Sequence, residues 1–169
     1  MFIAHLPSGY ILATAIVERV RSLPVKASTV IAAGILGALA PDFDMLYFYL
    51  IDNRQTHHHK YFSHWPLLWL CLIMVSSWWC RFSSQSKIAF IILIFSLAGL
   101  LHILLDTLVG DIWWFAPFFN EPYALFTVPA VVKPWWLNFI VHWSFAVELA
   151  ICFWAVVKYR LRSKTNSLD

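Results

Sequence analysis

The sequence predicts an all-α fold, a polytopic transmembrane helical bundle of about five helices. Three observations predict it: 61% of the 169 residues are hydrophobic, only 12% are charged, and the chain contains 10 Trp and 14 Phe. The mean hydropathy of +0.71 lies above the usual range of soluble domains. The length corresponds to one domain, so we expect residues 1–169 to form a single membrane-embedded domain.

Five apolar runs account for the predicted helices: residues 3–18, 28–51, 65–80, 88–109 and 135–157. About 20 residues are needed to cross a hydrocarbon core of ~30 Å, so the first and third runs are short. Either of these two could lie in the interface instead, with its polar face in water. The first run lacks the basic region and the cleavage site of a signal peptide, so we expect it to remain as a membrane segment.

The basic residues orient the predicted bundle. With all five runs as spans, one side holds nine of the 12 Lys and Arg residues, namely Arg19, Arg21, Lys26, Arg81, Lys87, Lys158, Arg160, Arg162 and Lys164. The positive-inside rule places this side in the cytoplasm and the N-terminus outside. Residues 158–169 then form a basic cytoplasmic tail near anionic lipid. The net charge of +3 is modest, so we expect no nucleic-acid binding.

Side chains that can bind metal gather at the outer side of this topology. Four of the seven histidines lie in HHHKYFSHW, residues 57–65. His102 and Asp106 come 14 and 18 residues after Ile88, which carries them ~21–27 Å toward the outer surface. An ionisable group inside a bilayer costs ~2.5–3.5 kcal/mol and usually marks a functional site. Imidazole and carboxylate together suit zinc and similar ions, so a bound divalent cation would neutralise the cluster.

The two aspartate motifs also have simpler structural explanations. His102 and Asp106 lie four residues apart on one helix face, so they either grip one ion or only stabilise the bundle as a pair. Pro41 should end the preceding helix, because it lacks an N–H donor. Asp42 or Asp44 could then simply cap the next helix.

The histidine-rich stretch predicts a turn followed by a helix. His59 and His64 fit a turn that enters a helix at Ser63, with Pro66 in its first turn. Such a turn can bring the two imidazoles together without a shared helix face. The preceding pair, residues 57–58, could be only protonatable loop histidines.

Three further residues have an open role. His5 could be a solvent-exposed terminal histidine, although its side of the membrane matches that of the other candidates. His142 could be a buried histidine that pairs with a neighbour rather than a metal ligand. Glu148 lies six residues deeper in the same run, with a partner that the sequence does not identify.

Several of these segments together resemble a known family. They are His5 near the start, PDFD at 41–44, HKYFSH at 59–64, and GLLHILLDTL followed by WWFAPF. They are similar to the LexA-regulated, inner-membrane-bound metal-dependent hydrolase (YdjM-like) family, over roughly residues 1–120. Lys60 stands where the family usually has Arg, and Ser63 where it has Thr. The resemblance implies a multi-pass protein of the bacterial inner membrane, with an active site that faces the periplasm in the topology above.

A more distant resemblance is to the zinc-dependent phospholipase C and P1 nuclease group. It rests on matching positions alone, which are His5, Asp42 or Asp44, His59, His64, His102 and Asp106. That group's later His-x-x-x-Glu motif has no counterpart, because Ala146 follows His142 by four residues. The cofactor that this resemblance implies is Zn²⁺, as one to three ions, or another divalent transition metal.

The two resemblances imply hydrolysis of a phosphoester in a phospholipid or lipid-linked substrate at the outer leaflet. The expected metal ligands are His5, His59, His64, His102, Asp106 and one aspartate of PDFD. The other aspartate, Asp42 or Asp44, is then the general base. Lys60 would attract phosphate as a point charge. Loop 110–134 forms either a lid or re-entrant floor over the head group, or only part of the outer surface.

Two other functions stay open. A metal-transport or metal-handling protein would need polar groups that continue to the cytoplasmic side, and the inner halves of the predicted spans are apolar apart from Glu148. A non-catalytic membrane scaffold with a structural metal would hold its ion in a closed site of four protein ligands. The sequence indicates neither the lipid head group nor the oligomeric state.

Overall fold

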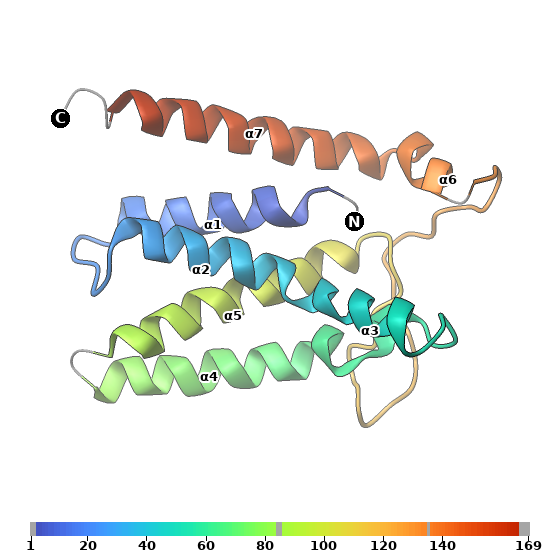
Figure 1. Ribbon diagram of the computed structural model, residues 1–169, viewed down its shortest axis with the longest axis horizontal. Helices are drawn as coiled ribbons and strands as arrows, with labels where there is room; N and C mark the ends of the chain where they lie inside the picture. The colour runs from blue at the N-terminus through green and yellow to red at the C-terminus, as the bar shows by residue number, and fades with distance from the viewer. Residues whose placement is uncertain (1–2, 84–85, 135, 166–169) are drawn as a thin grey trace.

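The computed structural model describes residues 3–83, 86–134 and 136–165, and its regular structure is helical (Figure 1). The elements in chain order are α1 His5–Arg19, α2 Ala27–Leu39, η1 Pro41–Phe43, α3 Asp44–Leu50, η2 His58–Lys60, η3 Phe62–His64, α4 Pro66–Phe82, α5 Lys87–Asp106, α6 Trp136–Val141 and α7 Ser144–Thr165. Within the described ranges, β pairing is limited to one isolated bridge between Ile112 and Tyr123. The predicted all-α class is confirmed.

Two of the five predicted runs divide into shorter helices. α2 ends just before Pro41, as predicted, and the helices on either side of this break are bent by 53°. The run 135–157 divides into α6 and α7 at a turn, where His142 Nδ1 lies 3.0 Å from Ser144 Oγ. α7 also continues beyond the predicted end to Thr165, because Lys and Arg are good helix formers in spite of their polarity. Residue 135 lies outside the described residues.

α5 is the helix that is long and apolar enough to cross a membrane by itself, with 20 residues and a hydropathy of 2.8. α2 meets the same criteria only when it is joined to the bent segment 41–50, and α4 is apolar but shorter. By length and composition alone, the described helices therefore supply one crossing segment, or two with the bent pair. This count is smaller than the five predicted from hydropathy.

Close packing of α1, α2 and α5 places the ends of these helices together. Gly9 of α1 lies so close to α2 that a Cβ atom at this position would stand 2.5 Å from the carbonyl oxygen of Gly34. Gly37 of α2 makes a similar approach to the backbone of α5 at Phe95. Small residues permit such backbone contact between helices. As a result, the first turn of α1 lies against the last turn of α2, next to the end of α5.

The two ends of the bundle differ in composition. Figure 1 shows that α1, α4 and α7 end, and α2 and α5 begin, at one end of the molecule. The nine basic residues predicted for one side lie in these helix ends or, for Arg21 and Lys26, in the connection between α1 and α2. The opposite end carries η1, α3, η2, η3 and segment 107–134. The histidine-rich stretch lies at this second end, which we call the histidine end.

α7 is joined to α1 at both ends. Near the histidine end, Glu148 Oε2 accepts hydrogen bonds from the backbone N–H groups of Ile3 (2.6 Å) and Ala4 (3.2 Å). At the basic end, Lys158 Nζ donates to Glu18 at 2.6 and 2.8 Å. The buried Glu148 therefore has a structural partner, namely the backbone just before α1. This contact fixes the start of the helix that carries His5.

Candidate metal centre

Six predicted ligands from separate parts of the chain meet at the histidine end. They are His5 of α1, Asp42 of η1, His59 of η2, His64 of η3, and His102 and Asp106 of α5. Five of the six residues are buried, and Asp42 is the partly exposed member. Three of their side chains lie almost entirely out of solvent, with exposed fractions of 0% for His64 and His102 and 2% for Asp106.

The carboxylate of Asp106 is the focus of this cluster. Its Oδ2 atom lies 2.9 Å from His102 Nε2, 3.6 Å from His59 Nε2 and 3.9 Å from His64 Nε2. Its Oδ1 atom lies 3.1 Å from His5 Nε2. The ring of His5 also stacks on that of His102, with centroids 3.6 Å apart. Four imidazoles from four segments therefore surround one carboxylate.

Three of these imidazoles have their other nitrogen bonded to an oxygen atom. His102 Nδ1 lies 2.7 Å from the carbonyl oxygen of Ala38, and His59 Nδ1 lies 3.0 Å from that of Asp111. A carbonyl oxygen only accepts, so we assign the proton of each ring to Nδ1. The Nε2 lone pair then faces Asp106. Metal-binding histidines in proteins usually show this arrangement, with the outer nitrogen held by a carbonyl or carboxylate.

The third imidazole, His64, is held by Asp44. Asp44 Oδ2 accepts from His64 Nδ1 and from Ser63 Oγ, both at 2.6 Å. Ser63 therefore orients Asp44 and does not begin the helix, so that part of the turn prediction is wrong. The cap residue of α4 is Trp65, and Pro66 occupies the first turn as predicted. Ser63 lies in the 3-10 turn before Trp65, and its hydroxyl donates to Asp44.

The structure places the two PDFD aspartates differently. Asp42 Oδ1 lies 3.6 Å from His102 Nε2 and 3.8 Å from His64 Nε2, so Asp42 faces the centre directly. Asp44 contacts the centre through His64 alone. Neither helix start at this position has a side-chain cap hydrogen bond, so capping does not account for either residue. The side chain of Asp42 is 38% exposed, whereas that of Asp44 is 7% exposed.

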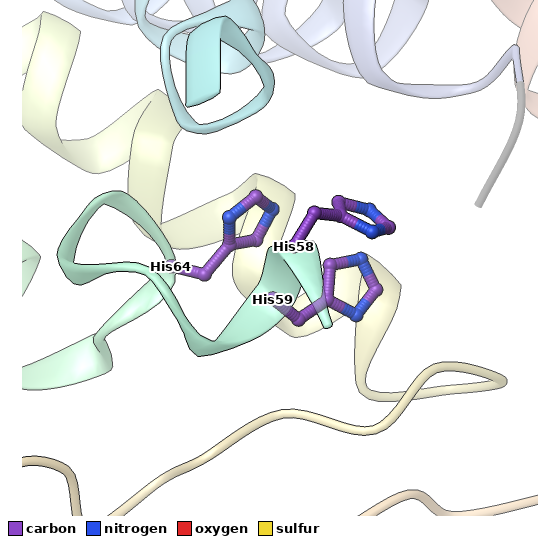
Figure 2. A group of neighbouring side chains, drawn as sticks. All are labelled: His58, His59 and His64. Atoms are coloured by element: carbon purple, nitrogen blue, oxygen red, sulfur yellow. The ribbon is translucent and has the colours of Figure 1, made fainter. Parts of the chain in front are cut away.

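A neighbouring group of histidines extends the site. His58, His59 and His64 bring one nitrogen each within 4.8 Å of one another, and Figure 2 shows their rings gathered around η2. Burial lowers the pKa of His58 to about 4 and that of His59 to about 2. Both rings are therefore neutral at pH 7, which is the form that binds metal. His57 is exposed and stacks on His58, with centroids 5.4 Å apart.

The remaining predicted residues lie outside the cluster. Lys60 is exposed, and its ammonium lies 5.8 Å from the ring centroid of Trp113. His142 pairs with Ser144, as the simpler of the two explanations above predicts, although it is half-buried rather than buried.

Segment 107–134 folds back onto the end of α5. The backbone N–H of Leu125 donates to the carbonyl of Thr107 at 2.8 Å, and that of Phe126 donates to Leu108 at 3.0 Å. Gly110 lies against the ring of His59, where an added Cβ would stand 2.9 Å from Cε1. Together with the carbonyl of Asp111, this segment sets the orientation of His59. Sequence patterns gave no signal for this role, because any residue can supply a backbone carbonyl.

The comparisons with known proteins identify the family. The chain matches the family model described as YdjM inner membrane protein over residues 1–165. The chain belongs to this family. The predicted family resemblance is thereby confirmed, and the family description supports association with the inner membrane. The searches of curated proteins and of solved structures returned no match. The more distant likeness to the phospholipase C and P1 nuclease group is not shown by these comparisons.

The donor set fits a transition-metal ion. His64 Nε2 is fully buried and has no hydrogen-bond partner among the described residues. An unsatisfied buried polar atom costs about 1–3 kcal/mol, and an ion at this position would satisfy it. Several neutral imidazoles with one or two carboxylates form the ligand chemistry that zinc and its neighbours prefer.

Proposed function

We propose that this protein is a multi-pass membrane hydrolase that uses a metal centre to cleave a phosphoester in a phospholipid or another lipid-linked substrate. One observation carries the proposal. The Nε2 atoms of His59, His64 and His102 converge on Asp106, while the Nδ1 atom of each ring is bonded to an oxygen. This arrangement directs the three Nε2 atoms toward one point, as in metal-binding histidines.

The proposed membrane arrangement follows the polarity of the two ends. We infer that α1, α4 and α7 also span the bilayer, together with α5 and the bent α2–α3 segment. Large apolar side chains on the outside of the bundle support this, since Trp78 of α4 is 69% exposed and Phe153 of α7 is 71% exposed. The positive-inside rule places the basic end in the cytoplasm and the metal centre at the periplasmic leaflet.

The residues placed to hold the metal are Asp106, His102, His64 and His59, with Asp42 and His5 at the edge of the same cluster. Zn²⁺ is the ion that this set suits best, as one to three ions, although another divalent transition metal would also fit. When bound, such an ion acidifies water toward a pKa of ~7 and polarises a phosphoryl oxygen. These two effects are what phosphoester hydrolysis requires.

Asp42 is the candidate general base. Its carboxylate faces the centre and also reaches solvent, so it can accept a proton from water and release it again. Asp44 is instead a positioning residue, because it contacts the centre only through His64. Lys60 is exposed and adjacent to His59 in the sequence, and it would attract a phosphate group as a point charge.

Two features favour hydrolysis over the other functions. A structural zinc site is closed by four protein ligands, whereas this cluster has more than four candidate donors and a solvent-exposed side at Asp42. A transport path would need polar groups facing a channel below the centre. The buried hydroxyls of Thr14, Ser76 and Ser96 instead donate to carbonyls of their own helices.

Elemental analysis of the purified protein tests the proposal. We expect at least about one equivalent of zinc or a similar ion per chain, and a large loss of metal in the His64→Ala variant. His142→Ala is the matched control, because His142 lies outside the cluster, and it should keep its metal. Release of phosphorylated head groups from lipid extracts by the wild-type protein would then establish the activity. Equal metal content in wild type and His64→Ala would reject the site.

A further inference from the structure

A cavity lies beside the metal centre, between the bent segment 41–50 and the helices α4 and α5. Its volume is about 630 Å³, within the range of ~300–1,000 Å³ that is usual for ligand sites. Most of its lining is apolar or aromatic, with Phe43, Tyr47, Leu68, Trp69, Leu72 and Phe95 among the lining residues. Apart from Asp44 and Ser63, the residues that line this cavity have no role in the metal centre described above.

One end of the cavity is polar and adjoins the metal centre. Asp44 and Ser63 line this end. Asp44 uses Oδ2 for His64, but its Oδ1 atom is fully buried and has no hydrogen-bond partner among the described residues. The side chain is 7% exposed, so solvent hardly reaches it. This acceptor needs a donor, and a hydroxyl or amine of a bound molecule would supply it.

The other end of the cavity extends along α4 and α5, away from the metal centre. Phe95 lies 11 residues before Asp106 on α5, which corresponds to ~16 Å along the helix axis. Leu72 lies six residues after Pro66 on α4, which corresponds to ~9 Å. The direction from Asp44 to Phe95 is therefore that of an acyl chain whose head group lies at the periplasmic surface.

The wall of the cavity is fixed by Trp69. Its indole Nε1 donates to the carbonyl of Ser63 at 2.8 Å. Its ring lies directly against Gly99 of α5, where an added Cβ would collide with the ring. The side chain is 3% exposed, so it is held in one position. A preformed wall of this kind selects a ligand by shape.

We propose that this cavity binds one acyl chain of a membrane phospholipid, whose head-group ammonium or hydroxyl donates to Asp44 Oδ1 and whose phosphate reaches the metal centre. This inference rests on the proposed function for the identity of the bound molecule as substrate. Membrane lipid is as apolar as the cavity, so burial of the chain adds little affinity. The cavity therefore selects the chain by fit and positions the phosphoester.

Photo-crosslinking tests the binding site directly, without requiring turnover. The full chain is reconstituted in lipid nanodiscs with phosphatidylethanolamine that carries a diazirine midway along one acyl chain, and the labelled residues are mapped by mass spectrometry. We expect labels on cavity-lining residues of α4 and α5. Leu72→Trp fills the cavity, and we expect it to reduce this labelling by about tenfold, since overpacking a fixed cavity is costly.

Leu70→Trp is the matched control. Leu70 is on the same helix and is 42% exposed, but it does not line the cavity, so its labelling should equal that of the wild type. Leu68→Trp is a second filling variant in case Leu72→Trp does not fold, with the same expected loss. Equal labelling in the filling variants and the control would overturn the proposal, as would labels confined to the lipid-exposed surface.

Turnover separates this inference from the proposed function. With long-chain phospholipid, the filling variants should show a KM at least about tenfold higher than the control, while dibutyryl phospholipid should be cleaved equally by all. Cleavage that is insensitive to the filling variants at every chain length would overturn the substrate assignment. Cavity labelling in a protein that contains no metal and cleaves no phospholipid would instead reject the proposed function and leave the chain-binding site established.

Discussion

The two ends of the bundle handle polar groups in opposite ways. At the basic end, Lys158 and Glu18 form an ion pair in which the glutamate side chain is 55% exposed. At the histidine end, the side chains of His64 and Asp106 are 0% and 2% exposed, and His64 is bonded to Asp44. Exposed charges are solvated by water and need no protein partner, whereas buried ones require a network. The contrast indicates that the histidine end is where polarity serves a function.

Asp106→Asn should have the largest effect, because it removes the charge at the focus of four imidazoles. We expect metal content below about a tenth of the wild-type value and a loss of phosphoester cleavage of at least ~10²-fold. Elemental analysis and head-group release measure the two effects. If Asp106→Asn kept its full metal content and cleaved normally, the buried polar groups of the histidine end would not serve the proposed function.

The two aspartates of the break should differ in kind. Asp42→Asn should retain metal and lose about 10²–10⁴-fold in turnover, as expected for a general base. Asp44→Asn should weaken metal affinity by about 10–100-fold, because His64 loses its supporting carboxylate. Titration with a zinc chelator, together with turnover at saturating metal, distinguishes them. Wild-type turnover in Asp42→Asn would reject its role as base.

The histidine end should also make stability depend on pH in the metal-free protein. Burial lowers the pKa of His58 to about 4 and of His59 to about 2, from ~6.5 in the unfolded chain. Below pH ~6.5 the unfolded chain therefore takes up protons that the folded chain does not. Stability should fall as the pH drops from ~6.5 toward 4, by on the order of 1 kcal/mol per pH unit.

Thermal unfolding of chelator-treated protein at pH 7 and pH 5 measures this dependence. His59→Gln should reduce the difference in Tm between the two pH values, since glutamine does not titrate. An unchanged difference in that variant would show that other groups cause the pH dependence.

Lys158→Ala should have the smallest effect, because exposed ion pairs contribute only ~0–1 kcal/mol and are screened by salt. We expect a change in Tm of at most a few degrees and unchanged metal content. A loss of metal in this variant would mean that the basic end acts on the histidine end through α7.

Much of the candidate site was predictable from the amino-acid sequence. His and Asp residues are rare within the apolar runs of this chain and therefore indicate a site. Their positions along the predicted spans placed them at a similar depth in the membrane. His102 and Asp106 were predictable as a pair because helix geometry alone puts them on one face. The helix break at Pro41 was predictable because proline lacks the backbone donor.

Other parts of the site depend on contacts between distant segments. Sequence spacing does not distinguish Asp42 from Asp44, because a short 3-10 turn decides which carboxylate faces the centre. The carbonyls of Ala38 and Asp111 have no sequence signature, yet they orient His102 and His59. The prediction that Ser63 begins a helix was wrong, because residues 62–64 form a 3-10 turn and Trp65, with an extended backbone, precedes α4. Ser63 instead donates to Asp44, 19 residues away.

Composition and local spacing were thus sufficient to predict an all-helical, membrane-associated chain with its candidate metal ligands at one end. These properties follow from hydropathy and helix periodicity, which are local. Tertiary packing alone decided that Asp106 is the focus, that Asp44 supports His64, and that an apolar cavity adjoins them. These depend on the close approach of α1, α2 and α5, which no pattern within a single segment encodes.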